Sequence, residues 1–337
     1  MNIVVYDVAA SGGGGETILR QYIDAAKKSE NQKWWFIVSL PELIREASDN
    51  VNILYQPELN KKGIRKWIHR FIFEHTKLRK IIRQINPDRV LSLQNMTMPK
   101  ANCPQTVYLH QSLQFAPVKF RFFKKEERSL AVRQRIICRL IQKNLRKADE
   151  IIVQTNWMKE AAAKWIGIPE YRIRVEKPIS PDHSNHEKIS VSRSKNRFFY
   201  PANASIYKNH QIIVEACMLL KKQGICDYHI NFTLNPSENT HIRALYEKVQ
   251  KEQLPISFVG YQNRKAMCEK YAECTLLFPS YIETFGLPLQ EASAFDAPIL
   301  VSDCQYAHEV LIGYSHCEYI PWNDANAWAE AMRQKLR

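Results

Sequence analysis

Two glutamates in one short stretch are well suited to chemistry on a sugar. The stretch, residues 278–302, reads FPSYIETFGLPLQEASAFDAPILVS and holds Glu283 and Glu291 with seven residues between them. Glu283 follows an apolar run that ends near Ser280. Pro288 suits the first turn of a helix, because its missing N–H would be unpaired there anyway. Carboxylates accept hydrogen bonds from hydroxyl groups, so this loop could hold the hydroxyls of two sugars.

The backbone between the two glutamates suits a phosphate. The N–H groups of Phe285, Gly286 and Leu287, next to Thr284, would lie at the positive end of the helix. Gly286 lets a ligand approach the backbone closely. A phosphate site with a carboxylate on each side predicts a nucleotide sugar as the ligand. The alternative is that a glutamate in a first helical turn only stabilises the helix dipole, which requires no ligand.

The elements that must position this loop alternate along the chain. Short apolar runs are separated by helical patterns, and the runs are NIVVYDV, WWFIVSL, VNILY, DRVLSLQ, QTVYLH, DEIIVQT, RFFYPA, YHINFTL, ISFVG, CTLLFPS, PILVS and CEYI. This alternation predicts parallel sheets covered by helices on both faces. Residues 64–85 form one long helical pattern with the apolar residues on one face.

We therefore expect an α/β fold with two Rossmann-like, doubly wound domains that face a central cleft. The expected boundaries are residues 1–178, a polar linker at 179–195, residues 196–322, and a C-terminal helix at 323–337 that packs back toward the first domain. Ligands of such sheets bind at the carboxyl ends of the strands.

Other residues with chemical potential follow predicted strands. Gly13 and Gly14 belong to a run of four glycines in a chain that has ten, and Thr17 stands where a dinucleotide fingerprint would need its third glycine. His110 ends one predicted strand, and Lys208 and Tyr261 follow two others. A histidine at such a position is as compatible with a structural role as with a catalytic one, and a lysine at a helix start is compatible with simple solvation.

The positive charge of the chain is concentrated in one segment. Residues 61–147 contain 22 Lys and Arg against 4 Asp and Glu, whereas the whole chain carries a net charge of +14. Within this segment, QFAPVKFRFFKKEER interleaves phenylalanines with basic residues. Such a surface suits an anionic membrane or a nucleic acid. No apolar run is long enough to span a membrane, no secretory signal is evident, and the eight cysteines show no zinc spacing, so we expect a cytoplasmic protein without a bound metal.

Two segments resemble the retaining glycosyltransferases of family 4. ETFGLPLQEASAFDAPIL is similar to the family hallmark EGFGLPLLEAMACGTPVI, an E-x7-E motif, and YPANASIYKNHQIIVEA is similar to VGRLSPRKNVELLIEA. The resemblance implies a GT-B fold in which Glu283 contacts the donor sugar, Glu291 the nucleotide ribose and Lys208 the donor diphosphate. Asn203 replaces the arginine of the family, which leaves the second phosphate partner open.

The resemblance also assigns roles in the other loops. In similar enzymes a glycine-rich loop, here with Gly13 and Gly14, lies against the donor phosphates, a histidine at the position of His110 lies near the donor sugar, and the region of Tyr261 frames the base. The resemblance implies that His110, Lys208 and Glu283 are the catalytic residues and that the reaction needs no cofactor.

The function expected is transfer of a sugar, with retention, from a nucleotide sugar to a polyprenyl-diphosphate-linked glycan in O-antigen or capsule synthesis. A UDP-sugar is favoured slightly over GDP- or dTDP-sugars. Residues 61–147 would attach the chain to the inner face of the bacterial cytoplasmic membrane, and no nucleic acid is expected as a partner. The alternatives are a non-catalytic relative that binds sugar nucleotides and a basic nucleic-acid-binding protein.

Overall fold

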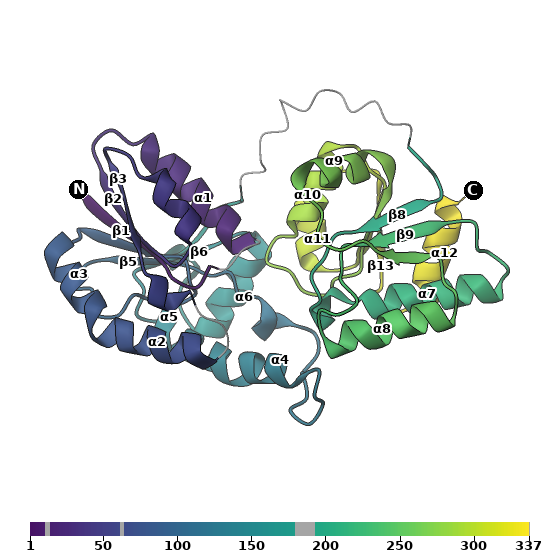
Figure 1. Cartoon of the computed structure of the whole chain (residues 1–337), viewed down its shortest axis with the longest axis horizontal. Coiled ribbons are helices and arrows are strands. Elements are labelled where there is room, and N and C mark those ends of the chain that lie inside the picture. Colours follow the sequence, from purple (N-terminus) through teal and green to yellow (C-terminus); the bar gives the residue numbers. More distant parts are fainter. Residues whose placement is uncertain (11–13, 61–63, 179–192, 337) are drawn as a thin grey trace. The chain divides into compact units, whose positions relative to one another are not determined.

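The computed structural model describes residues 1–10, 14–60, 64–178 and 193–336, and it divides into two compact units. One unit comprises Met1–Gln111 and Arg135–Ile179, and the other comprises Ser112–Gln134 and Ser180–Arg337. Each unit is built on one parallel sheet, as Figure 1 shows.

The sheet of the first unit has the strand order β3-β2-β1-β4-β5-β6-β7 among the described residues. Its interior strand β1 is buried from Ile3 to Tyr6, as expected of a parallel strand covered on both faces. The register places Val5 of β1 beside Phe36 of β2 and Leu91 of β4. The strands are β1 (Asn2–Asp7), β2 (Lys33–Val38), β3 (Val51–Tyr55), β4 (Arg89–Ser92), β5 (Gln105–Tyr108), β6 (Glu150–Val153) and β7 (Ile173–Val175).

Helices cover both faces of this sheet. Ile18, Leu19 and Ile23 of α1 pack into one apolar cluster, whereas Leu78 and Ile82 of α3 pack into another on the opposite face, as the two sides of the sheet in Figure 1 show. The helices of the first half are α1 (Gly14–Lys27), α2 (Ile64–His75), α3 (Lys77–Ile85), α4 (Arg128–Val132), α5 (Cys138–Leu145) and α6 (Asn156–Ile166). Helix α4 lies in the segment that is grouped with the second unit.

The long helix pattern predicted over residues 64–85 is two helices, α2 and α3, separated at Thr76. Thr76 has φ −115° and ψ −81°, which is not helical. The interruption changes which residues face the core: Phe73 and Leu78 are buried, whereas Phe71 and Ile72 are more than half exposed. The predicted single helix was therefore wrong, and the apolar residues Phe71 and Ile72 of α2 do not face the core.

The sheet of the second unit has the order β10-β9-β8-β11-β12-β13 among the described residues. From β8 the chain moves outward through β9 to β10, and it then returns to the other side of β8 to form β11, where Phe199 pairs with Leu276. The loops after β8 and β11 therefore flank a topological switch point, where ligands of doubly wound sheets bind. The strands are β8 (Arg197–Tyr200), β9 (His229–Phe232), β10 (Ile256–Phe258), β11 (Thr275–Phe278), β12 (Ile299–Ser302) and β13 (Cys317–Ile320).

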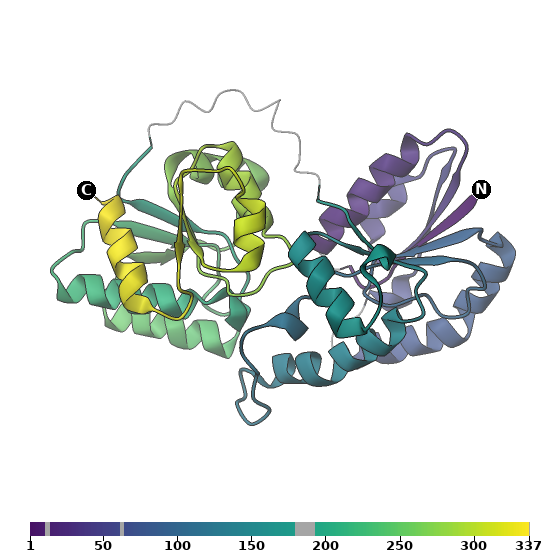
Figure 2. The ribbon, with the colours of Figure 1, turned by 180° about the vertical axis from the view of Figure 1, so that it is seen from behind.

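Helices α7 and α8 lie on one side of the second sheet, and α9, α10 and α11 lie on the other (Figure 1). Helix α12 packs against α7 of its own unit (Figure 2), where the sequence predicted a contact toward the first domain. The helices are α7 (His210–Lys222), α8 (Thr240–Lys251), α9 (Arg264–Glu273), α10 (Leu287–Ala294), α11 (Gln305–Val310) and α12 (Ala325–Lys335).

The predicted α/β fold class is confirmed, with two doubly wound parallel sheets. Most of the predicted linker, residues 179–192, lies outside the described ranges, so the domain boundaries stay a prediction. Within the part of the chain that the structure describes, no helix is both long and apolar enough to cross a bilayer.

Candidate active site

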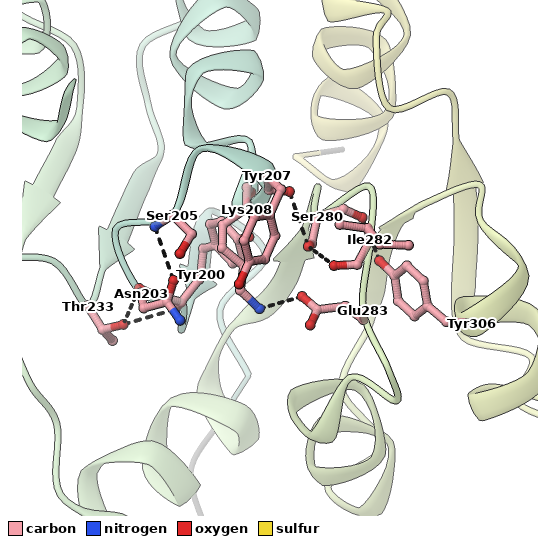
Figure 3. Close-up of polar contacts among 11 residues, drawn as sticks. Tyr200, Asn203, Ser205, Tyr207, Lys208, Thr233, Ser280, Ile282, Glu283 and Tyr306 are labelled. Atoms are coloured by element: carbon pink, nitrogen blue, oxygen red, sulfur yellow. Dashed lines mark hydrogen bonds and ion pairs between the residues drawn. The ribbon is translucent and has the colours of Figure 1, made fainter. Parts of the chain in front are cut away.

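The loops after β8 and β11 bring Lys208 and Glu283 together. Lys208 ends a short 3-10 turn, Ile206–Lys208, and Glu283 lies five residues beyond the end of β11. Figure 3 shows the two side chains pointing toward each other from these loops, and the Nζ of Lys208 forms an ion pair with Oε1 of Glu283. Both side chains are only 13% exposed. The sequence predicted both residues as site residues but did not predict that they pair.

Aromatic side chains fix the position of Lys208. The hydroxyl of Tyr200 donates to the Lys208 carbonyl at 2.5 Å. The Nζ lies 5.6 Å from the centre of the Tyr207 ring and 5.8 Å from that of Phe278. These distances allow cation–π attraction. The ammonium is therefore held at the switch point by Glu283 and two rings, and an anionic ligand that arrives there meets a preorganised cation.

Hydrogen bonds between the two loops, and one from Tyr306 of α11, brace the site, as Figure 3 shows for Ser280, Tyr207 and Tyr306. The Tyr306 hydroxyl donates to the Ser280 carbonyl at 2.6 Å, and the Ser280 hydroxyl donates to the Tyr207 carbonyl at 3.3 Å. Asn209, with φ +60°, donates through its side chain to the carbonyls of Pro279 at 3.3 Å and Trp322 at 2.8 Å. The loop that carries Glu283 is thus tied to the loop that carries Lys208.

The start of α10 lies directly after Glu283. Gly286 is the N-cap residue with φ +90°, and it provides no side-chain cap, so the first N–H groups of α10 receive no such bond. A Cβ at Gly286 would lie 3.3 Å from the Cδ1 of Leu289. Any other residue at this position would also have to adopt a positive φ, which is unfavourable for residues with a side chain. Glycine therefore supplies both the turn and the space at this helix end. Phosphate binding by the N–H groups of Phe285, Gly286 and Leu287 stays a prediction.

Glu291 has partners of its own and does not contact Lys208 in this structure. Its carboxylate, in a residue only 9% exposed, accepts a hydrogen bond from the Nη1 of Arg264 at 2.5 Å through Oε1. Its Oε2 accepts one from the Tyr271 hydroxyl at 2.8 Å. Sequence reasoning missed Arg264 and Tyr271. The available signal was their spacing of seven residues on α9, which places both on the face toward α10.

Asn203 and Tyr261 are exposed residues of the loops after β8 and β10. Asn203 accepts the N–H of Ser205 through its Oδ1 at 3.1 Å, so its side chain stabilises the turn after β8. Tyr261 is 89% exposed and follows Gly260, which has φ +68°. The Nε2 of Gln262 lies 3.0 to 3.3 Å from three carbonyl oxygens of this loop and so presents Tyr261 on a braced backbone. Thr284, between Glu283 and Phe285, also belongs to the site loop.

In the first unit, His110 follows β5 at the carboxyl edge of the sheet. Its ring stacks on Tyr108 with 4.4 Å between ring centres, and the backbone N–H of His110 donates to the Oδ1 of Asn95 at 2.7 Å. Its Nε2 is buried and meets no hydrogen-bond partner among the described residues. Burial lowers the pKa of His110 to about 4, and the imidazole is therefore neutral at pH 7. Gly13 lies outside the described residues, and Gly14 begins α1.

Metal-ligating side chains do not gather in the described ranges: no three residues among His, Cys, Asp and Glu there could hold a metal ion together. The groups available for chemistry in the second unit are therefore a lysine, two carboxylates and the uncapped start of α10 at the carboxyl ends of the strands.

Models of two protein families match the chain. The model described as Glycosyltransferase Family 4 matches residues 12–176, and the model described as Glycosyl transferases group 1 matches residues 182–337. The O-antigen chain mannosyltransferase RfbU of Salmonella typhimurium is 22% identical over 206 residues, which are 58% of this chain and 53% of that protein. The match thus spans about half the length of this curated relative.

Several solved structures share the fold of this chain. Sucrose-phosphate synthase from Thermosynechococcus elongatus superimposes with a TM-score of 0.74 at 18% identity, covering 99% of this chain and 89% of that one. WaaG, a glycosyltransferase involved in lipopolysaccharide biosynthesis, gives 0.71 at 15% identity, with 99% and 90% covered. Anabaena HepE in complex with UDP and glucose gives 0.68 at 14% identity, with 100% and 91% covered.

Proposed function

We propose that this chain transfers a sugar from a nucleotide sugar to a glycan acceptor with retention of configuration. The GT-B fold and the two glycosyltransferase family models that match the two halves of the chain support this proposal. The observation that carries the proposal is the Lys208–Glu283 ion pair beside the uncapped start of α10. It offers a cation and helix N–H groups to a diphosphate, and a carboxylate to the adjoining sugar.

Each residue has a role in the proposed reaction. Lys208 and the first N–H groups of α10 stabilise the negative charge that develops on the leaving diphosphate. Glu283 accepts hydrogen bonds from the hydroxyls of the donor sugar. The acceptor hydroxyl attacks on the face that the diphosphate leaves, and a phosphate oxygen takes its proton. For His110, whose imidazole is neutral at pH 7, a role near the donor sugar stays a prediction from the family resemblance.

The nucleoside binds between Glu291 and the loop that carries Tyr261. Glu291 accepts hydrogen bonds from the ribose, and the exposed Tyr261 ring offers a surface against which a base can stack. HepE was solved with UDP and glucose bound, which favours a UDP-sugar here as well.

We place the reaction in the synthesis of a surface polysaccharide, because RfbU acts on O-antigen chains and WaaG takes part in lipopolysaccharide biosynthesis. A polyprenyl-diphosphate-linked glycan in O-antigen or capsule synthesis is the proposed acceptor. Its membrane location is compatible with the surface of residues 61–147. In this range, α2 exposes Ile68, Phe71 and Ile72 among basic residues, and Phe123 is 97% exposed. Apolar side chains surrounded by lysine and arginine suit the interface of an anionic bilayer at the inner face of the cytoplasmic membrane.

A second function, binding of sugar nucleotides without transfer, is favoured by one observation. Asn203, which stands where the family resemblance expects an arginine, uses its side chain to stabilise its own turn. The acceptor-independent hydrolysis of nucleotide sugars separates the two functions, since a transferase cleaves its own donor slowly in water whereas a pure binder leaves it intact.

A further inference from the structure

A cavity of about 250 Å³ lies in the first unit, at an edge of the sheet that the proposed reaction does not use. It opens between the last turns of α3 and the loop before β5, and Arg79, Arg83, Lys100 and Cys103 are among its lining residues. This position is at the amino ends of β4 and β5, whereas His110 follows the carboxyl end of β5. Ligands of doubly wound sheets bind at the carboxyl ends, so the fold itself does not account for this cavity.

Three cations line the cavity, and no carboxylate is among its lining residues. Arg79 and Arg83 are four residues apart and so share one face of α3, and Lys100 belongs to the loop before β5. All three are exposed, and none forms an ion pair within the part of the chain that the structure describes. A helix C-terminus carries only about half a negative charge, so the end of α3 does not balance three cations.

Two carboxylates lie near the cavity wall but are bonded elsewhere. Burial raises the pKa of the Cys103 thiol, and the charges of Asp88 and Asp149 add to the rise. The Oδ2 of Asp88 accepts the N–H of Asn2 at 2.6 Å, and the Oδ2 of Asp149 accepts the N–H of Gln105 at 2.8 Å. The cations of the cavity therefore keep their mutual repulsion, which a bound anion would relieve.

The backbone of the cavity wall has an unusual conformation at Lys100. Its φ is +66°, in the left-handed region that residues with a long side chain rarely adopt. Asn86, directly after α3, has φ +48°, but asparagine tolerates this region. A costly backbone conformation at a cation that lines a cavity is typical of a binding site.

A phosphate group fits the cations of this cavity. Guanidinium groups bind phosphate oxygens through parallel N–H bonds, and an ammonium group adds a compact charge. The side-chain amides of Asn86 and Asn102 also line the cavity, and amides form hydrogen bonds with hydroxyl groups. The volume of about 250 Å³ is below the roughly 300 to 1,000 Å³ of most small-molecule sites, so the cavity suits a small group rather than a nucleotide sugar.

We propose that this cavity binds a small phosphate ester that carries hydroxyl groups. Arg79, Arg83 and Lys100 contact the phosphate oxygens, and the amides of Asn86 and Asn102 contact the hydroxyl groups. Glycerol phosphate has this chemistry, both as a free metabolite and as part of the head group of phosphatidylglycerol. The proposal is independent of the proposed function, since none of these residues takes part in the transfer reaction.

Cys103 provides a local readout, because it lines the cavity and is only partly buried. The test measures the rate at which iodoacetamide, a neutral reagent, alkylates Cys103 in the full chain with and without glycerol phosphate, followed by mass spectrometry of peptides. Glycerol phosphate at about ten times its dissociation constant is expected to slow this alkylation roughly 10-fold by mass action. Cys226, which is exposed in the second unit, should react at an unchanged rate, and neutral glycerol should protect neither thiol.

Two variants each remove one cation of the cavity. Arg83→Met and Lys100→Met are expected to raise the concentration of glycerol phosphate needed for protection roughly 10-fold. Lys80→Met is the matched control, since Lys80 is an exposed cation of α3 that lines a neighbouring hollow but not this cavity. Lys80→Met should preserve the protection, and thermal melting shows that each variant is folded.

Vesicles distinguish the two sources of the phosphate ester. Phosphatidylglycerol mixed with phosphatidylcholine is compared with phosphatidylcholine alone. Stronger protection of Cys103 by the mixed vesicles than by soluble glycerol phosphate, at equal phosphate concentration, identifies a lipid head group. Stronger protection by the soluble ester identifies a free metabolite, and either result supports the site.

Three results would overturn the proposal while the proposed function stands. The first is no protection of Cys103 by either source, or equal protection of Cys226. The second is undiminished protection in both Arg83→Met and Lys100→Met. The third is an equal loss of protection in Lys80→Met, which would assign the ligand to the neighbouring hollow.

Discussion

Lys208 and Glu283 form an ion pair across 75 residues of sequence, between the loops after two adjacent strands. The pair exists because β8 and β11 are neighbours at the switch point of the second sheet, so their carboxyl ends present both side chains to the same space. A ligand with a diphosphate next to a sugar matches this pair of charges, the anion toward Lys208 and the hydroxyls toward Glu283.

The two glutamates are expected to fail in different ways. Glu283→Gln keeps the shape of the side chain but removes its charge next to the donor sugar, so kcat should fall roughly 100-fold or more with nucleotide affinity changed little. Glu291→Gln should mainly weaken the binding of the nucleoside diphosphate, because this carboxylate contacts Arg264 and Tyr271 away from Lys208. Steady-state kinetics combined with titration of the nucleotide distinguishes the two. The same loss of nucleotide affinity in both variants would contradict these assignments.

Gly286→Ala is expected to lose both stability and diphosphate binding. The alanine must adopt φ +90° and place its Cβ 3.3 Å from Leu289, which together should cost about 1 kcal/mol or more. Gly224→Ala is the control, because Gly224 has φ +75° and a Cβ there meets nothing within 4 Å. Denaturant unfolding should show a loss in both variants, whereas only Gly286→Ala should bind UDP more weakly. Normal UDP binding by Gly286→Ala would remove the start of α10 from the proposed site.

The stability of the chain is expected to fall as the pH drops from about 6.5 toward 4. Burial lowers the pKa of His110 to about 4, so below its ordinary pKa the unfolded chain binds a proton that the folded chain does not. The contribution of the histidine to the free energy of unfolding is therefore fully present above its pKa in the unfolded chain. It is lost as the pH falls toward the pKa in the folded chain, by up to about 1.4 kcal/mol per pH unit for each such histidine. His210, with a pKa lowered to about 3 mainly by burial, adds to the effect.

Denaturant unfolding at several pH values measures this dependence. The variant His110→Gln should show a slope smaller by about one proton between pH 6 and 5. An unchanged slope in that variant would mean that the imidazole of His110 titrates normally in the folded chain.

Membrane binding is expected to depend on the exposed apolar face of α2. The double substitution Phe71→Ser and Ile72→Ser removes two side chains that are more than half exposed, and it should reduce retention on anionic liposomes at low salt. Tyr171→Ser removes an aromatic side chain of similar exposure outside residues 61–147 and should leave retention unchanged. Equal retention of all three proteins in a flotation assay would mean that α2 does not contact the membrane. If the unsubstituted chain is not retained at all, the proposed membrane attachment is wrong.

The sequence predicted the fold class because buried parallel strands are short apolar runs, as in β1 and β11, whose burial does not depend on distant detail. It did not predict that the helix over residues 64–85 is interrupted at Thr76, nor that Phe71 and Ile72 of α2 are exposed. It also expected exposed aromatic residues around residue 120, but only Phe123 is fully exposed there, whereas Phe120 is buried.

In the site, Glu283, Gly286 and Glu291 could be found because they lie in one contiguous segment whose pattern carries the chemistry. The pairing of Lys208 with Glu283 depends on strand order, which apolar periodicity does not determine. Arg264 could not be found in the same way, since an arginine in the first turn of a helix has the pattern of a solvated residue. Its role becomes visible only when α9 and α10 are packed together.

The most direct test of the account is acceptor-independent hydrolysis of a panel of UDP-, GDP- and dTDP-sugars by the purified chain. Lys208→Met is measured alongside, with Lys222→Met as a control for loss of an exposed lysine at the far end of α7. The account predicts slow hydrolysis of one nucleotide sugar, reduced roughly 100-fold or more in Lys208→Met and unchanged in Lys222→Met. Hydrolysis that survives in Lys208→Met would contradict the assignment of the leaving-group site, and tight binding without any hydrolysis, even with glycan acceptors added, would establish a binding protein instead.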